Sequence, residues 1–189
     1  MHRMQKLTLL VDGAEREQSS PAIFETRKMS TGAPQIVLSV PNEQTDLLCQ
    51  LTALLSPPYF ALYILHTPRG EAEPGRYQSP ELSRQELTYL LRTYAVFWSS
   101  DARHDLWVHS PASHATLVWD RHNLLFAEGH ALDDVREALL QSGFREGQLE
   151  RLGAHTHHYR AEFDAEAASL LKEFDWHRTP LRPEDVQRD

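Results

Sequence analysis

The stretch that most constrains the fold is "YFALYILH", residues 59–66. Successive side chains of a β-strand point to opposite faces of the sheet. Here apolar and aromatic residues occupy both faces almost without interruption. A strand that is apolar on both faces is typical of the interior of a sheet that is covered on each side. We therefore expect residues 59–66 to form a central strand, and the chain to contain helices that cover it.

The clearest helix follows residue 83. Ser83 and Glu86 have the spacing of a capping box, in which each side chain accepts a backbone N–H of the first turn. Apolar residues then recur at helical spacing at Leu87, Leu90, Leu91, Tyr94, Phe97 and Trp98. Similar spacing predicts further helices over residues 43–55 and 132–141, and a last helix capped by Asp164.

Three short apolar runs in the middle of the chain predict an antiparallel meander. Residues 105–110, 115–120 and 123–129 are separated by turn-forming residues. Trp107 and Trp119 lie on consecutive runs, and we expect them to be cross-strand neighbours.

The order of these elements predicts the fold class. Strands alternate with helices on both sides of the meander, which indicates an α/β protein with an α+β tendency. We expect a mixed sheet with a central antiparallel meander and helices packed on it, and two related α/β halves as a further interpretation. The predicted organisation is an N-terminal arm or irregular segment at 1–34, a single α/β domain at 35–177 and a loose C-terminal tail at 178–189.

The charge and the single cysteine narrow the classes of partner and location. The formal net charge is −8, which disfavours nucleic acid and anionic membranes as partners because both attract clusters of Lys and Arg. No stretch has the length of a membrane span, and the apolar stretch near the N-terminus is too short for a secretory signal. We expect a cytoplasmic protein with Cys49 as a buried thiol, and either a protein partner, a small-molecule ligand or a homodimer.

The sharpest polar feature is "AHTHHYR", residues 154–160. If this stretch is a strand, His155 and His157 share one face and His158 points the other way. Two histidines so placed can reach one metal ion, but zinc requires three or four ligands. The histidines considered as the third ligand are His66, His109 and His114. Because no recognised zinc motif completes the set, we expect a histidine-rich strand without a cofactor; zinc or a similar metal at His155 and His157 is the alternative.

A second polar cluster is "HTPRGEAEPGRY", residues 66–77. It follows the expected central strand, and ligands of open α/β sheets bind beyond the ends of strands. His66 is a candidate base, and Arg69 and Arg76 are candidates for clamping a carboxylate or phosphate. The alternative is a solvated surface loop. A third cluster, "HSPASH" at 109–114, is better explained as a hairpin turn than as part of a catalytic triad.

These observations leave three functional interpretations. The first is a non-catalytic protein that binds a protein partner or a small ligand. The second is a metal-dependent hydrolase that uses the histidine-rich strand. The third is an immunity-type or inhibitor module whose acidic face blocks a basic target. The absence of a recognised catalytic motif favours the first.

Overall fold

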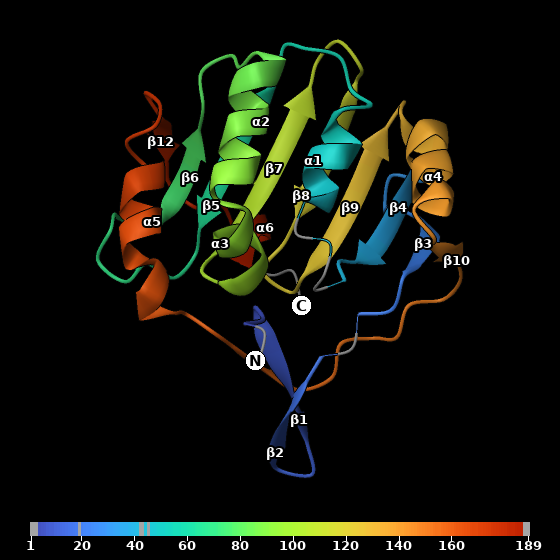
Figure 1. Ribbon diagram of the computed structural model, residues 1–189, viewed down its shortest axis with the longest axis horizontal. Coiled ribbons are helices and arrows are strands. Elements are labelled where there is room, and N and C mark those ends of the chain that lie inside the picture. The colour runs from blue at the N-terminus through green and yellow to red at the C-terminus, as the bar shows by residue number, and fades with distance from the viewer. Residues whose placement is uncertain (1–3, 19, 42–43, 45, 187–189) are drawn as a thin grey trace.

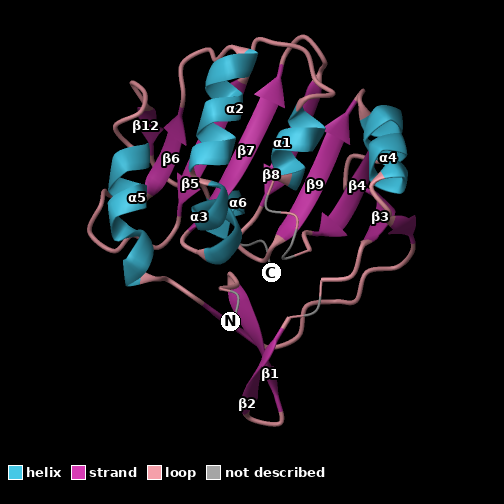
Figure 2. Cartoon of the chain, in the orientation of Figure 1, coloured by secondary structure: helices cyan, strands magenta, loops and turns pink. Residues whose placement is uncertain are grey.

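A computed structural model describes residues 4–18, 20–41, 44 and 46–186. Among these residues, nine strands form one mixed sheet, in which only β10 and β3 pair in parallel. Helices α1, α2, α4 and α5 lie on one face of this sheet, as Figures 1 and 2 show. Along the sheet the strands are β10 (Arg145–Glu146), β3 (Ile23–Lys28), β4 (Pro34–Ser39), β9 (Leu124–Gly129), β8 (Ala115–Trp119), β7 (His104–Ser110), β5 (Phe60–Leu65), β6 (Gly75–Gln78) and β12 (His177–Thr179).

The helices are short, and α1, α2, α4 and α5 form a layer over one face of the sheet (Figure 1). They are α1 (Leu47–Thr52), α2 (Arg84–Thr93), α3 (Ala95–Ser100), α4 (Leu132–Gln141), α5 (Asp164–Leu170) and α6 (Pro183–Val186), with a 3-10 turn at Ala161–Phe163. The predicted fold class is therefore confirmed: helices pack on a mixed sheet that contains the antiparallel meander β7–β8–β9. Within the described residues, no helix is both long and apolar enough to cross a membrane.

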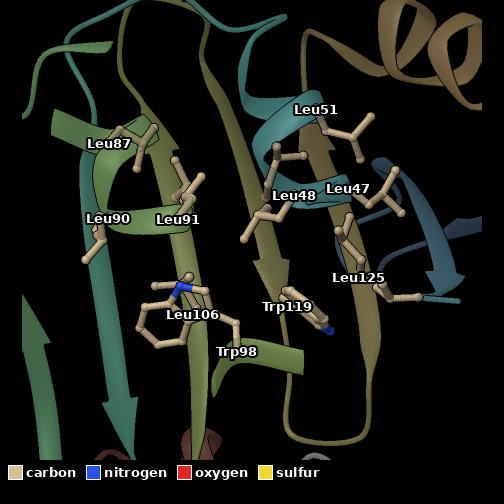
Figure 3. Packing of buried hydrophobic residues seen from close by; sticks show 14 of the residues in the cluster. Leu47, Leu48, Leu51, Leu87, Leu90, Leu91, Trp98, Leu106, Trp119 and Leu125 are labelled. Atoms are coloured by element: carbon tan, nitrogen blue, oxygen red, sulfur yellow. The ribbon is translucent and has the colours of Figure 1, made fainter. Parts of the chain in front are cut away.

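The core lies between the sheet and this helical layer. Figure 3 shows leucines of α1 and α2 directed toward Leu106, Trp119 and Leu125 of the sheet. The predicted central strand is β5, which lies between β7 and β6. Tyr63 and Ile64 are both fully buried although they point to opposite faces of β5, so this strand is covered on both sides.

A smaller sheet of three strands lies beside the large one. It contains β11 (His155–His157), β1 (Leu7–Val11) and β2 (Ala14–Glu17), in that order, and both pairings are antiparallel. In Figure 1 β1 and β2 extend away from the large sheet. The predicted arm at 1–34 thus contains β1 and β2, but it also contains β3, which pairs with β4 in the large sheet. Likewise β12 and α6 extend into the predicted tail, whose last three residues lie outside the described part.

Several local predictions were wrong. The helix predicted from residue 83 to 98 is in fact two helices, α2 and α3, with the break at Tyr94. The hydroxyl of Tyr94 donates to Glu173 Oε1 at 2.6 Å, and this bond draws its side chain toward the segment after α5. Asp164 is the first residue of α5 rather than its cap, because its carboxylate accepts from Arg69 and Arg103 instead. The helix predicted at 43–55 is reduced to α1, with positions 43 and 45 outside the described residues.

Two predictions about side chains also differ from the structure. Trp107 is opposite Val118, whereas Trp119 is opposite Leu106. The two tryptophans are one position out of register, so they point to opposite faces of the sheet and are not direct cross-strand neighbours. Cys49, expected to be buried, is half-buried on α1.

Candidate metal centre

Three histidines from two different sheets converge at one place. His155 and His157 are on β11 of the small sheet, and His122 is in the turn between β8 and β9 of the large sheet. One ligand nitrogen from each lies within 4.8 Å of the other two. The ring centroids of His122 are 5.3 Å from His155 and 4.9 Å from His157. This cluster is the best candidate for a functional site among the described residues.

The pairing of β11 with β1 explains why two histidines face the same way. His157 is opposite Leu7 and His155 is opposite Leu9, so alternate residues of both strands share one face. The strand is fixed at its end because the His158 N–H donates to the Lys6 carbonyl at 2.8 Å and the His158 carbonyl accepts from Ala102 at 3.0 Å. The predicted alternation is therefore present over His155–His157, where β11 ends, and His158 is the residue that follows the strand.

Asp120 and Asn123 fix the turn that presents His122. Asp120 Oδ1 accepts the backbone N–H groups of His122 and Leu124, at 2.9 and 2.8 Å. Asn123 has a φ of 62°, a left-handed conformation that asparagine tolerates better than most residues. Its side chain accepts from Trp119 Nε1 at 3.0 Å and donates to the Val40 carbonyl at 2.8 Å. His122 is buried, and the hydrogen bonds of Asp120 before it and Asn123 after it hold the turn in place.

The hydrogen bonds also determine which nitrogens are available to a metal. His122 Nδ1 lies 3.1 Å from Asp120 Oδ2, and His155 Nδ1 lies 2.9 Å from the Gly153 carbonyl. Because a carboxylate and a carbonyl only accept, Nδ1 is the donor in both rings, and Nε2 is the nitrogen left to bind a metal. His157 Nε2 is buried and has no hydrogen-bond partner among the described residues. All three Nε2 atoms can therefore serve as ligands.

The imidazole of His157 is held in the neutral form that metals require. Burial, followed by repulsion from His122 and His155, lowers its pKa to about 3. A metal ion consequently does not have to displace a proton from this ring at neutral pH.

A buried lysine lies beside the turn. Lys6 is 1% exposed, and its ammonium group donates to the Asp120 carbonyl at 2.7 Å and lies 4.8 Å from the centroid of the Trp119 ring. Burial lowers its pKa to about 8, against the opposing effect of the carboxylates of Asp120 and Asp105. The Asp120 carboxylate is thus balanced by a nearby cation, while its Oδ2 remains directed at His122.

The spacing of the cluster can be compared with that of a zinc site. Zinc binds histidine nitrogen at about 2.1 Å, so tetrahedral ligands lie roughly 3.4 Å apart. The 4.8 Å upper limit here means that the rings must approach by about an ångström on binding. His155 and His157 are only half-buried, so their side chains have room to rotate.

None of the histidines proposed as the third ligand lies in this cluster. His66 Nε2 instead contacts Asp105 Oδ2 at 3.0 Å, in a buried pair. His109 Nδ1 lies 2.9 Å from the hydroxyl of Thr116, and the ring of His114 packs on that of His130 at 5.3 Å. The third histidine of the cluster, which the sequence did not reveal, is His122.

The residues proposed to clamp an anion have carboxylate partners. Arg69 Nε lies 3.0 Å from Asp164 Oδ1. Arg76 is buried, pairs with Asp185 and lies 5.6 Å from the centroid of the Trp107 ring. An anion at this loop would therefore compete with a carboxylate for each guanidinium group, and anion binding at His66, Arg69 and Arg76 stays a prediction.

The arrangement brings together three imidazoles, one of them hydrogen-bonded to a carboxylate, which is a donor set of the kind that zinc binds. Comparisons with models of known protein families, with curated protein sequences and with solved structures gave no match. The function must accordingly be argued from the site itself.

Proposed function

We propose that this protein binds one transition-metal ion of the zinc class through His122, His155 and His157. The observation that supports the proposal is the convergence of three imidazoles, two from the small sheet and one from a turn of the large sheet, with the Nδ1 of two of them already bonded. Asp120 orients His122 in the way that second-shell carboxylates orient metal-binding histidines. Three protein ligands leave the fourth tetrahedral position for water or a small ligand.

This proposal makes the second interpretation of the sequence more specific. His122 supplies the ligand that the histidine-rich strand lacked. The inhibitor interpretation depends on the acidic composition of the chain, and no comparable cluster among the described residues supports it. Binding of a small ligand, the first interpretation, is compatible with the open position of such a metal.

Hydrolysis is a second candidate function. Catalytic zinc sites commonly have three protein ligands and a bound water, and the metal lowers the pKa of that water to about 7. Zinc-dependent release of p-nitrophenol from its acetate or phosphate ester would support a hydrolase. A metal-loaded protein that is inactive on both esters would favour ligand binding without catalysis.

Zinc stoichiometry and affinity test the proposal directly. Untagged protein should bind one zinc ion per chain, measured by elemental analysis and by competition with a chromophoric chelator. Alanine at His122, His155 or His157 should weaken binding by about 100-fold or more, because loss of a second-shell partner alone weakens it 10–100-fold. The matched control is His158→Ala, at the position just after the same strand, which should bind zinc normally. Equal affinity in all four variants would contradict the proposal.

The remaining sequence-based expectations accompany this proposal. We propose a cytoplasmic location, a small-molecule or protein partner rather than nucleic acid, and a homodimer as the alternative to a monomer. Cell fractionation and light scattering test the first and last of these.

A further inference from the structure

One face of the small sheet continues from the metal centre toward the hairpin between β1 and β2. Leu9 is opposite His155 on β11 and opposite Arg16 on β2. Directly opposed residues of antiparallel strands share a face. His155, Leu9 and Arg16 therefore form a row across the three strands, with Arg16 on the same face as the proposed ligands. Glu15 and Glu17 flank Arg16 in sequence and so point to the opposite face.

The distance along this row suits a small ligand. Neighbouring strands lie about 4.8 Å apart, so the backbone of Arg16 is about 10 Å from that of His155. A histidine side chain with its metal extends from one end of the row and an arginine side chain from the other. A molecule of only a few atoms can therefore touch both the metal and the guanidinium group.

Exposure indicates from which side a ligand can enter. Leu7, beside His157, is 1% exposed, whereas Val11, on the same face near the hairpin turn, is 37% exposed. The face thus opens to solvent toward the turn, where Arg16 is also exposed. A ligand that approaches the metal from this side passes Arg16.

Arg16 differs from two other basic residues near the centre, Lys6 and Arg160, whose side chains are already hydrogen-bonded to carbonyl groups. Lys6 donates to the Asp120 carbonyl, and the Arg160 guanidinium donates to the carbonyls of Ser100 and Gln5. The side chain of Arg16 is exposed and makes no hydrogen bond or ion pair within the described part of the chain. Its guanidinium group is free to bind an external oxyanion, for which its planar donors are well suited.

The charge at the centre favours the same class of ligand. Three neutral imidazoles leave both positive charges of a divalent ion uncompensated. The nearest carboxylate, that of Asp120, is bonded to His122 and to two backbone N–H groups, and it has Lys6 as a counter-charge. An anionic oxygen is therefore preferred at the open position.

We infer that the centre recognises a small dianionic molecule, with one carboxylate or similar oxyanion on the metal and the second on Arg16. This inference rests on the proposed function, since it requires the metal. It assigns Arg16 as the residue that selects dianions over monoanions.

Cobalt-loaded protein provides the test. Cobalt(II) absorbs visible light, and its spectrum changes when the ligand at the open position changes. Titrations with succinate and with acetate should both perturb the spectrum. Arg16→Gln should weaken succinate binding by about tenfold or more, because charge-assisted hydrogen bonds are the strong ones, and should leave acetate binding within about twofold of wild type. The control Arg92→Gln, an exposed arginine on α2, should alter neither.

The outcomes distinguish the two proposals. Cobalt binding with equal succinate affinity in wild type and Arg16→Gln would overturn the role of Arg16. Cobalt binding without any spectral response to succinate or acetate would overturn an anion-accepting centre while leaving metal binding intact. Failure of the wild-type protein to bind cobalt or zinc would overturn the proposed function, and this inference with it.

Discussion

The two sheets of this protein are stabilised in different ways. The large sheet buries an apolar face under helices, and Leu90, Leu106 and Trp119 are all nearly inaccessible to solvent. In the small sheet every residue of β2 is exposed, and Leu10 of β1 is 42% exposed. Burial of apolar surface stabilises the first, whereas the second has little apolar surface to bury.

The small sheet depends instead on a few polar attachments to the rest of the protein. Lys6 is attached to Asp120, and Arg160 is attached through its backbone N–H to Asp101 at 2.8 Å and through its side chain to Gln5. Hydrogen bonds to charged groups contribute about 1.5–3 kcal/mol each, less than a packed core contributes in total. A metal ion that joins the two sheets would therefore stabilise the small sheet more than the large one.

The largest expected effect comes from the core of the large sheet. Leu90→Ala on α2 should lower the free energy of unfolding by about 2–5 kcal/mol, because it leaves a cavity under the helix. The matched control Leu10→Ala in the small sheet should change it by about 0.5 kcal/mol or less, since that side chain is largely solvated already. Urea unfolding measures both, and similar losses in the two variants would remove the contrast between the sheets.

Zinc should act mainly on the small sheet. At 100 times its Kd, zinc should stabilise the folded protein by about 2.7 kcal/mol if only the folded state binds it. Hydrogen exchange should slow in β1 and β11 and change little in β5 and β6 of the large sheet, which carry none of the three histidines. His122→Ala should abolish both effects and His158→Ala neither. If zinc slowed hydrogen exchange equally in both sheets of the wild type, the metal would not act specifically on the small sheet.

The buried core should make stability sensitive to acid. His104 is fully buried against the rings of Phe97 and Trp98, and burial, followed by repulsion from Lys6, holds its pKa well below the usual value of 6.5. Below about pH 6.5 the imidazole of His104 is therefore protonated in the unfolded chain but not in the folded chain. The free energy of unfolding consequently falls as the pH falls. The resulting loss in the free energy of unfolding approaches about 1.4 kcal/mol per pH unit and amounts to roughly 2 kcal/mol between pH 6.5 and 5.

His104→Leu isolates this contribution from that of the other histidines. Urea unfolding with a chelator present, at pH 7, 6 and 5, should show a smaller loss of stability in the variant than in the wild type. Parallel loss in the two proteins would exclude His104 as the cause.

The smallest expected effect concerns the orientation of His122. Asp120→Asn keeps an oxygen for the backbone of the turn but replaces the acceptor Oδ2 by an NH₂ group, which cannot accept from Nδ1. Zinc affinity should fall by about tenfold, as for other second-shell substitutions. Chelator competition measures the affinity, with circular dichroism as the control for folding. Unchanged affinity would show that the carboxylate does not orient the ligand.

Local sequence patterns predicted the elements whose residues interact mainly with neighbours in sequence. The capping box at Ser83 is present with both of its bonds, and the meander and α4 lie where the apolar spacing placed them. Strand β6 was missed because "GRYQ" has a charge in its centre. That charge is tolerated because Asp185, 109 positions away, pairs with Arg76, and local spacing contains no information about such a partner.

The metal centre was half predictable for the same reason. His155 and His157 are two positions apart, so strand alternation places them together. His122 is a single histidine in a turn, and only the fold brings it to β11. The one local indication was "DRHN", residues 120–123, in which an aspartate two positions before a histidine can orient the ring.

The pairing of β1 with β11 also has a consequence for the order of folding. Arg160 bonds the Gln5 carbonyl across 155 positions of sequence, and Lys6 bonds Asp120 across 114. Contacts of such separation require the closure of very long loops and form late. During synthesis β1 can pair with β2 soon after both are made, but its other edge stays unpaired until β11 has left the ribosome. The metal centre is therefore among the last parts of the molecule that can assemble. A bound ion would indicate that the chain between His122 and His157 has folded.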